Sequence, residues 1–286
     1  MKPMYCKIFL SAHATIHNLR RLTVGRIFFV GLALILSTPI SVFSQVDTSV
    51  SFNAIDECLT LHDSLRLCYT YKTNPKQKAR ALVVTLPMRS RTRATFGKID
   101  DVFAERFPEL SFLDFDLRGH GQSTIAGTDT LDFRTMSREE YTKIPHDIKD
   151  ALRMIRKKHK ELRRLPIIVI GASIGANSAG ILANIEDKVK AAALLSPGKD
   201  YLGLIPEPHL KMTDEKDILF MVGKQDTYSF ESTNELYKMT EGRKVLHVYN
   251  SANHGTNIPN NNEQALQDLT DWLGTVLKRI ESKKKQ

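Results

Sequence analysis

The chain has 286 residues, enough for one large domain or two small ones, and its composition, 42% hydrophobic and 26% charged, is that of an ordinary globular protein. Residues 1–44 hold five basic residues and no acid, so about half of the formal net charge of +9 comes from this segment. Basic runs at 156–164 and 283–285 contain no aromatic residue, which favours solvated surface over nucleic-acid binding.

The N-terminal segment has the order of a secretory signal. Arg20, Arg21 and Arg26 precede the apolar run 27–36, and a small residue, Ser44, stands at a candidate cleavage site. The apolar run is shorter than the roughly 20 residues that a membrane span needs. We therefore expect a signal peptide over 1–44 and export to the periplasm or the extracellular space. An uncleaved membrane anchor is the alternative.

Two cysteines remain after residue 44, and both lie in a predicted hairpin. Cys58 and Cys68 are each five positions from Asp63, the centre of a polar turn flanked by alternating apolar residues. Opposed residues of antiparallel strands bring their β-carbons close enough for a disulfide. We expect that disulfide if the chain is exported, and two buried thiols if it is not.

The rest of the chain alternates strands and helices. Six apolar runs of strand length stand at 81–86, 110–115, 167–170, 190–195, 218–222 and 244–249. Helical patterns occupy 99–107, 146–164, 174–185, 232–240 and 263–281. Runs that are apolar throughout, separated by helices, predict a mostly parallel α/β sheet covered on both faces, with the hairpin at one edge. No repeat or linker divides residues 45–286, so we expect a single domain there.

Three of the predicted strands are followed by residues that can form a catalytic triad. Ser173, Asp226 and His254 each come after a different strand, and the carboxyl ends of parallel strands meet at one edge of a sheet. A serine hydroxyl needs an imidazole to take its proton, and the imidazole needs an anion to hold its tautomer. Alone, each residue has an ordinary structural explanation, but the three together predict nucleophilic catalysis.

The segment around Ser173 predicts how the nucleophile is presented. Gly171 and Gly175 flank it in a strand-turn-helix connection, where they would leave room for the close approach of neighbouring backbone. The N–H of Ile174, at the start of the helix, is one candidate donor to an oxyanion. The N–H of Met88, after the first parallel strand, is the other.

At this point the sequence resembles the α/β-hydrolase superfamily, and most closely its dienelactone-hydrolase-like, serine-esterase branch. The resemblance covers most of residues 55–280. The motifs that carry it are DLRGHG (116–121), GASIGAN (171–177), LLSPGKDYLG (194–203), VGKQDTYS (222–229) and ANHGT (252–256). It implies the α/β-hydrolase fold, with Ser173 as nucleophile, Asp226 as acid and His254 as base.

Two details of the resemblance matter for the site. Many relatives have His-Gly or His-Gln after the first strand, where this chain has Pro87 and Met88, so the oxyanion hole depends on the Met88 N–H. Asp116 and His120 lie in a Gly-rich turn in which the resemblance implies a structural role.

The predicted activity is that of a serine hydrolase acting through an acyl-enzyme on an ester with a small or medium acyl group. Residues 198–216 are too few for a large cap, so we expect a minimal cap and an open pocket, lined by Tyr201 and Leu202. A peptidase or acyltransferase with the same triad, or a non-catalytic binding protein, remains an alternative. The sequence indicates no metal or nucleotide cofactor, and it leaves the oligomeric state open.

Overall fold

The structure, a computed structural model, describes residues 52–284, so the predicted signal over 1–44 lies outside the described residues. The strands are β1 (Asn53–Thr60), β2 (Leu65–Thr73), β3 (Ala81–Leu86), β4 (Leu110–Phe115), β5 (Ile125–Ala126), β6 (Asp129–Thr130), β7 (Ile167–Ala172), β8 (Val189–Leu195), β9 (Asp217–Gly223) and β10 (Arg243–Tyr249). The α-helices are α1 (Gly97–Arg106), α2 (Arg138–Thr142), α3 (Ile144–Lys158), α4 (Ile174–Ile185), α5 (Glu207–Leu210), α6 (Thr227–Met239), α7 (Asn257–Asn260) and α8 (Glu263–Lys284). Two 3₁₀ turns complete the set, η1 (Arg93–Phe96) and η2 (Lys160–Leu162).

All ten strands belong to one sheet, in the order β10-β9-β8-β7-β3-β4-β2-β5-β6, with β1 also paired to β2. The six strands from β10 to β4 are parallel, whereas β2 runs antiparallel to both β4 and β1. The predicted mostly parallel sheet with an antiparallel hairpin is therefore confirmed. Between β8 and β9 the chain forms one short helix, α5, which agrees with a minimal cap.

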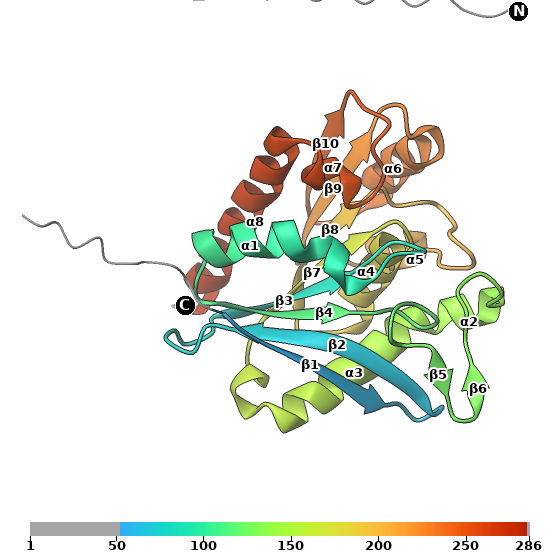
Figure 1. Ribbon diagram of the computed structural model, residues 1–286. Coiled ribbons are helices and arrows are strands. Elements are labelled where there is room, and N and C mark those ends of the chain that lie inside the picture. The colour runs from blue at the N-terminus through green and yellow to red at the C-terminus, as the bar shows by residue number, and fades with distance from the viewer. Residues whose placement is uncertain (1–51, 285–286) are drawn as a thin grey trace, which may run out of the picture. The chain divides into compact units, whose positions relative to one another are not determined.

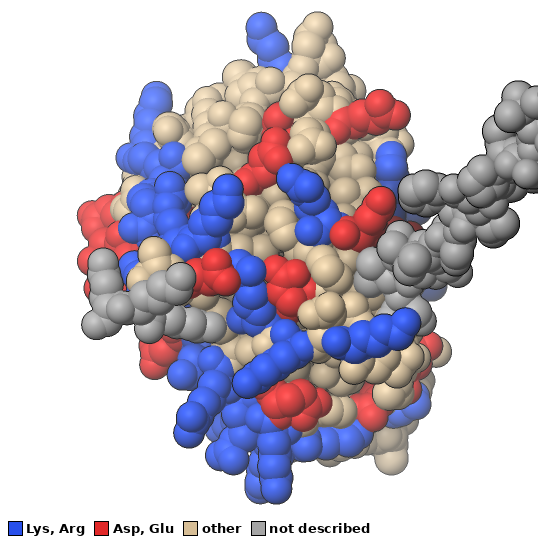
Figure 2. Space-filling model, turned by 90° about the vertical axis from the view of Figure 1, so that its left-hand side faces the viewer, with Lys and Arg blue, Asp and Glu red and all other residues tan. Residues whose placement is uncertain are grey.

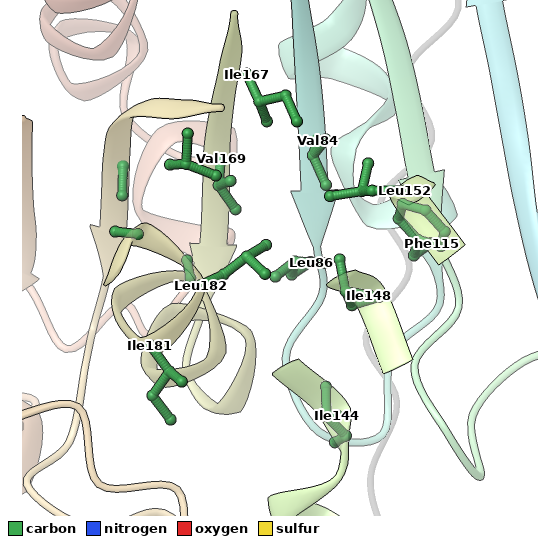
Figure 3. Packing of buried hydrophobic residues seen from close by; sticks show 14 of the residues in the cluster. Val84, Leu86, Phe115, Ile144, Ile148, Leu152, Ile167, Val169, Ile181 and Leu182 are labelled. Atoms are coloured by element: carbon green, nitrogen blue, oxygen red, sulfur yellow. The ribbon is translucent and has the colours of Figure 1, made fainter. Parts of the chain in front are cut away.

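Helices cover both faces of the sheet (Figure 1). Alternate residues of each parallel strand point to opposite faces: Val84 and Val169 pack with α3 and α4, whereas Val83 and Ile168 pack with α1 and α8. Figure 3 shows the first of these layers, where side chains of α3 and α4 meet those of β3 and β7. Because both faces need apolar residues, the strands are apolar throughout.

The chain departs from the predicted elements between β4 and β7. The short strands β5 and β6 and the helix α2 were not predicted, because they are too short to show a period. The helix predicted over 146–164 ends at Lys158 instead. Its last turn holds Arg156, Lys157 and Lys158, whose charges suit the negative end of a helix. The Arg156 guanidinium also donates to the carbonyls of Leu162 and Arg163, which fixes the turn that follows.

The hairpin has the predicted register. Cys58 pairs with Cys68 across β1 and β2, and a disulfide joins them. Cys68 is fully buried, and its backbone N–H donates to the Ser123 hydroxyl at 2.8 Å. The disulfide therefore fixes the outermost strand of this edge to a strand that lies in the core.

Removal of the disulfide should lower the free energy of unfolding by about 2–3 kcal/mol. A cross-link that closes a loop of this length reduces the conformational entropy of the unfolded chain, and this reduction stabilises the folded state by about that amount. Urea unfolding in the presence and absence of a thiol reductant measures the difference. A Cys58→Ser/Cys68→Ser variant is the control, since its midpoint should not respond to the reductant. Equal midpoints for the oxidised and reduced protein would contradict the prediction.

Candidate active site

Three loops at the carboxyl edge of the sheet carry the predicted triad. Ser173 directly follows β7, Asp226 follows β9 and His254 follows β10. The strands β7, β8, β9 and β10 are consecutive parallel neighbours, so their carboxyl ends open on the same edge. The topology thus delivers a hydroxyl, a carboxylate and an imidazole to one side of the molecule.

Ser173 sits on a strained turn. Its backbone has φ 54° and ψ −116°, a conformation that a residue with a side chain rarely adopts. The two glycines on either side are required by space: a β-carbon at Gly171 would lie 2.0 Å from the Gly175 carbonyl oxygen, and one at Gly175 would lie 2.1 Å from that of Leu86. The backbone contact between β7, α4 and the end of β3 therefore holds the serine at the tip of the turn.

Asp226 and His254 form a close pair. The His254 Nδ1 lies 2.6 Å from an Asp226 carboxylate oxygen. The loops that carry them are joined through the backbone, because the N–H groups of Lys224 and Gln225 donate to the carbonyls of Tyr249 and Ser251. With Nδ1 donating to the carboxylate, Nε2 of the imidazole is the nitrogen left to accept a proton.

The pKa of Asp226 lies below its ordinary value. Burial, the largest single influence, would raise this pKa, but hydrogen bonds from His254 and Ser229 outweigh it, with a further one from Ser196. The carboxylate is consequently charged at neutral pH, which is the state that can orient an imidazole.

The loop that carries His254 packs directly against the turn that carries Ser173. A β-carbon at Gly255 would lie 3.2 Å from the β-carbon of Ala172, and the Gly255 N–H donates to the Ser196 hydroxyl at 3.0 Å. Gly255 and Ala172 are therefore in close contact, and His254 and Ser173 are their immediate neighbours in the sequence. The Ser173 hydroxyl forms no hydrogen bond to His254 within residues 52–284.

Tyr201, predicted to line the pocket, lies between these groups. Its ring packs edge-on to that of His254, with 6.3 Å between centroids, and its hydroxyl lies 2.9 Å from the Ser229 hydroxyl. Ser229 is fully buried and also lies 3.3 Å from His254 Nδ1. Burial raises the pKa of Tyr201 to about 12, against hydrogen bonds from Ser229 and Ser173 that lower it. The phenol of Tyr201 is therefore uncharged at neutral pH.

The loop that carries Tyr201 is anchored by Asn177 to α4, the helix that follows Ser173. This fully buried amide donates to the carbonyls of Gly198 and Leu204, at 2.8 and 2.7 Å, and accepts from the Gly198 N–H at 2.9 Å. Leu202, also predicted for the pocket, is half-buried and, like Tyr201, packs against the apolar layer under α3 and α4.

The two predicted oxyanion donors belong to buried residues. Met88 is 6% exposed and Ile174 is 2% exposed. Within residues 52–284, neither N–H donates a hydrogen bond to another group. A buried N–H without an acceptor is costly unless a ligand supplies one. Both groups are thus suited to receive an oxygen atom of a substrate.

Asp116 and His120 have structural contacts. The Asp116 carboxylate accepts from the backbone N–H groups of Arg93 and Gln122 and pairs with the Arg93 guanidinium. His120 is buried, its Nδ1 lies 2.8 Å from the Arg118 carbonyl oxygen, and its ring stacks on Phe133. Burial, the main influence, lowers the pKa of His120, so this imidazole is neutral at pH 7.

Sequence reasoning missed Ser196, Ser229 and Asn177. Ser229 lies three residues after Asp226, and Asn177 four residues after Ser173, so both are one helical turn from a predicted residue. This spacing of one helical turn was the feature of the sequence that could have identified Ser229 and Asn177. In residues 52–284, no three His, Cys, Asp or Glu side chains are arranged to hold a metal ion, and no helix is sufficiently long and apolar to cross a bilayer.

Comparison with known proteins agrees with the fold. The family model Hydrolase_4, described as serine aminopeptidase, S33, matches residues 77–213. The match includes Ser173 and stops before Asp226 and His254. No curated protein matches the sequence.

Solved structures share the fold at low sequence identity. An esterase from Pyrococcus furiosus is 18% identical, with a TM-score of 0.63, and the match covers 80% of this chain and 92% of that one. Acetyl xylan esterase 1 from a Thermoanaerobacterium species is 17% identical, with a TM-score of 0.58 and coverage of 74% and 80%. Dienelactone hydrolase from Anabaena variabilis is 15% identical, with a TM-score of 0.59 and coverage of 78% and 98%.

Replacement of Asn177 by alanine should loosen the loop that carries Tyr201. Three buried backbone groups would lose their partner, at a cost of about 2–4 kcal/mol in the free energy of unfolding. Hydrogen exchange should become faster in residues 198–204 than elsewhere. Asn184→Ala, on the same helix but half-buried, is the control and should leave that exchange unchanged. Uniform exchange in both variants would show that Asn177 does not anchor the loop.

Proposed function

We propose that the chain is a serine hydrolase of the α/β-hydrolase superfamily and that it cleaves carboxylic esters with a small or medium acyl group. The observation that carries the proposal is the position of Ser173, on a strained turn in contact with the loop that holds the Asp226–His254 pair. A protein that only binds a ligand in this fold has no need of that strain or of that pair.

The reaction proceeds in two half-reactions. Ser173 Oγ attacks the ester carbonyl carbon while its proton moves to Nε2 of His254, and the oxyanion accepts hydrogen bonds from the N–H groups of Ile174 and Met88. Collapse of the tetrahedral intermediate breaks the carbon–oxygen bond, and the departing alcohol takes the proton from the imidazole. Water then attacks the acyl-enzyme by the same steps and releases the acid. Asp226 holds the imidazole in the required tautomer throughout.

Before the first step, the Ser173 hydroxyl has to turn toward His254. Within residues 52–284 this hydroxyl has no hydrogen bond to His254, and catalytic hydrogen bonds commonly tighten only when substrate binds. A substrate that displaces the Tyr201 hydroxyl would leave Nε2 of His254 as the best acceptor for the serine proton. Tyr201 thus acts at the entrance to the acyl site.

An ester fits the site better than the free N-terminus of a peptide, the substrate that the description of the matching family suggests. Binding a substrate ammonium group requires an unpaired carboxylate near the nucleophile. Asp226 is held by His254, and Asp200, next to Tyr201, is held by the Arg138 guanidinium and the Gly203 N–H at 2.6 and 2.7 Å. Acyl transfer to an acceptor other than water uses the same acyl-enzyme.

The location that we propose is outside the cytoplasm. Its support is the disulfide between Cys58 and Cys68 together with the signal-like order of residues 1–44. Whether the N-terminal segment is removed decides between a released and an anchored form, and N-terminal sequencing of the exported protein distinguishes them.

The proposal predicts that a fluorophosphonate probe labels Ser173 and that the protein hydrolyses nitrophenyl esters of short acyl chains. Ser173→Ala should abolish labelling and lower turnover by at least roughly 10³-fold, because the nucleophile is lost. Mass spectrometry of the labelled peptide and initial rates of ester hydrolysis measure both effects.

A matched control is Ser178→Ala, which removes a buried hydroxyl of α4 that donates to the Ile174 carbonyl at 2.8 Å and takes no part in the reaction. This variant should be labelled as the wild type is. Faster cleavage of aminoacyl nitroanilides than of esters would make the protein a peptidase. A folded protein that resists the probe would leave only the ligand-binding alternative.

Ser229→Ala should lower kcat/KM at neutral pH by roughly 10-fold, the effect of one lost hydrogen bond to a charged group. In addition, the part of the acidic fall in kcat/KM that is due to protonation of Asp226 should begin at a higher pH. The Ser229 hydrogen bond lowers the pKa of Asp226. Without it this pKa rises, so the carboxylate becomes protonated, and stops orienting His254, at a higher pH. Ser232→Ala, a buried serine one turn further along α6, is the control. Identical pH profiles for the two variants would exclude a positioning role for Ser229.

A further inference from the structure

The amino edge of the sheet, opposite the candidate active site, forms a separate face of the molecule. The pairing register aligns Asn53 of β1 with the first residues of the parallel strands, through to Asp217 and Arg243 at the far side. Figure 1 shows that the described C-terminal end of α8 lies on this side as well. We call this surface the amino-edge face.

The amino-edge face is strongly basic. Two adjoining hollows, of about 870 and 220 Å³, share Arg164 and together are lined by nine Lys and Arg residues and three acids. The basic residues are Lys78, Lys160, Arg163, Arg164, Lys188, Lys190, Arg243, Arg279 and Lys283. Figure 2 looks at this side of the molecule, where blue Lys and Arg side chains gather most densely over its lower part.

Part of this charge is fixed in place. The buried Asp217 carboxylate pairs with both Arg243 and Arg279, yet the two guanidinium side chains remain 42% and 46% exposed. One acid thus orients two cations toward solvent and neutralises only one of them. Burial, and next the charge of Lys190, lower the pKa of Lys216, as expected beneath a positive surface.

The N-terminal segment joins the domain at this same face. Residue 53 begins β1 at the amino edge, and the apolar run 27–36, preceded by Arg20, Arg21 and Arg26, lies upstream of it. The sixteen residues between them, 37–52, span at most roughly 55 Å when fully extended. If the apolar run is inserted in a bilayer, the linking residues are therefore short enough for the basic hollows to reach the surface of that bilayer.

We propose that the amino-edge face docks on an anionic lipid surface. Basic side chains near such a surface are attracted to its phosphate-bearing headgroups, and the attraction adds to a weak apolar anchor. Docking in this orientation leaves Ser173, at the opposite edge, directed toward the aqueous phase. The inference does not depend on the proposed ester hydrolysis.

Lipid is favoured over nucleic acid by the residues that line the two hollows. None of them is aromatic, whereas proteins that bind single-stranded nucleic acids stack bases on aromatic side chains. The apolar run 27–36 precedes this face in the sequence, and an apolar segment would contribute to binding a lipid surface but not to binding a soluble polyanion.

The test is co-sedimentation of the full chain with vesicles of phosphatidylcholine alone or mixed with phosphatidylglycerol. We expect tighter binding to the anionic vesicles, lost as salt is raised. Each basic residue near the surface contributes roughly fivefold in affinity, so Arg164→Glu/Lys188→Glu/Lys190→Glu should weaken that binding by more than 10-fold. The neutral variant Arg164→Gln/Lys188→Gln/Lys190→Gln should weaken it less, and it guards against misfolding of the first.

The matched control reverses three exposed basic residues toward the carboxyl edge, Arg66, Lys98 and Arg134, and should bind anionic vesicles much more tightly than the Arg164/Lys188/Lys190 variant does. If the two charge-reversed proteins lose equal affinity, net charge alone explains binding and the proposal fails. It also fails if neutral and anionic vesicles bind equally, or if heparin or duplex DNA binds more tightly than the vesicles at the same salt concentration. Ester hydrolysis in solution is measured separately and should be unchanged in every variant.

Discussion

The candidate site depends on one backbone contact, the approach of Gly175 to the end of β3. At this point α4, β7 and β3 are so close that a β-carbon at Gly175 would lie 2.1 Å from the Leu86 carbonyl oxygen. The contact sets the distance from Ser173, at the end of β7, to Met88, just past the end of β3. Ser173 and Met88, the proposed nucleophile and the proposed oxyanion donor, are 85 residues apart in sequence and are thereby held together through the backbone.

Asp226 and His254 are held by backbone contacts in the same way. The loops after β9 and β10 exchange hydrogen bonds from Lys224 and Gln225 to Tyr249 and Ser251, so the Asp226–His254 pair stands on a small rigid frame. Side chains then connect this frame to the nucleophile's helix, from Ser229 through Tyr201 to the loop that Asn177 anchors. Loss of any one of these hydrogen bonds would therefore alter the position of the His254 imidazole.

Periodicity and strand ends made the parallel sheet and the location of Ser173, Asp226 and His254 predictable, because apolar runs covered on both faces leave only their ends for polar chemistry. The segments β5, β6 and α2 were not predictable, since a strand of two residues and a helix of five have no period to detect. Ser229 and Asn177 escaped for a different reason. Their roles come from contacts to residues 21 to 28 positions away, and no local pattern records those contacts.

A sheet covered on both faces leaves two edges for interactions, and this molecule differs sharply between them. The carboxyl edge gathers a strained serine, the Asp226–His254 pair and the N–H groups of Met88 and Ile174, which have no acceptor within residues 52–284. The amino edge gathers exposed cations around the buried Asp217 and receives the N-terminal segment. Because the strands fix these edges on opposite sides, whatever holds the basic edge also sets the direction in which the nucleophile faces. A surface-bound enzyme of this kind would meet substrates from the aqueous side, and its acyl site would need no apolar rim in contact with the bilayer.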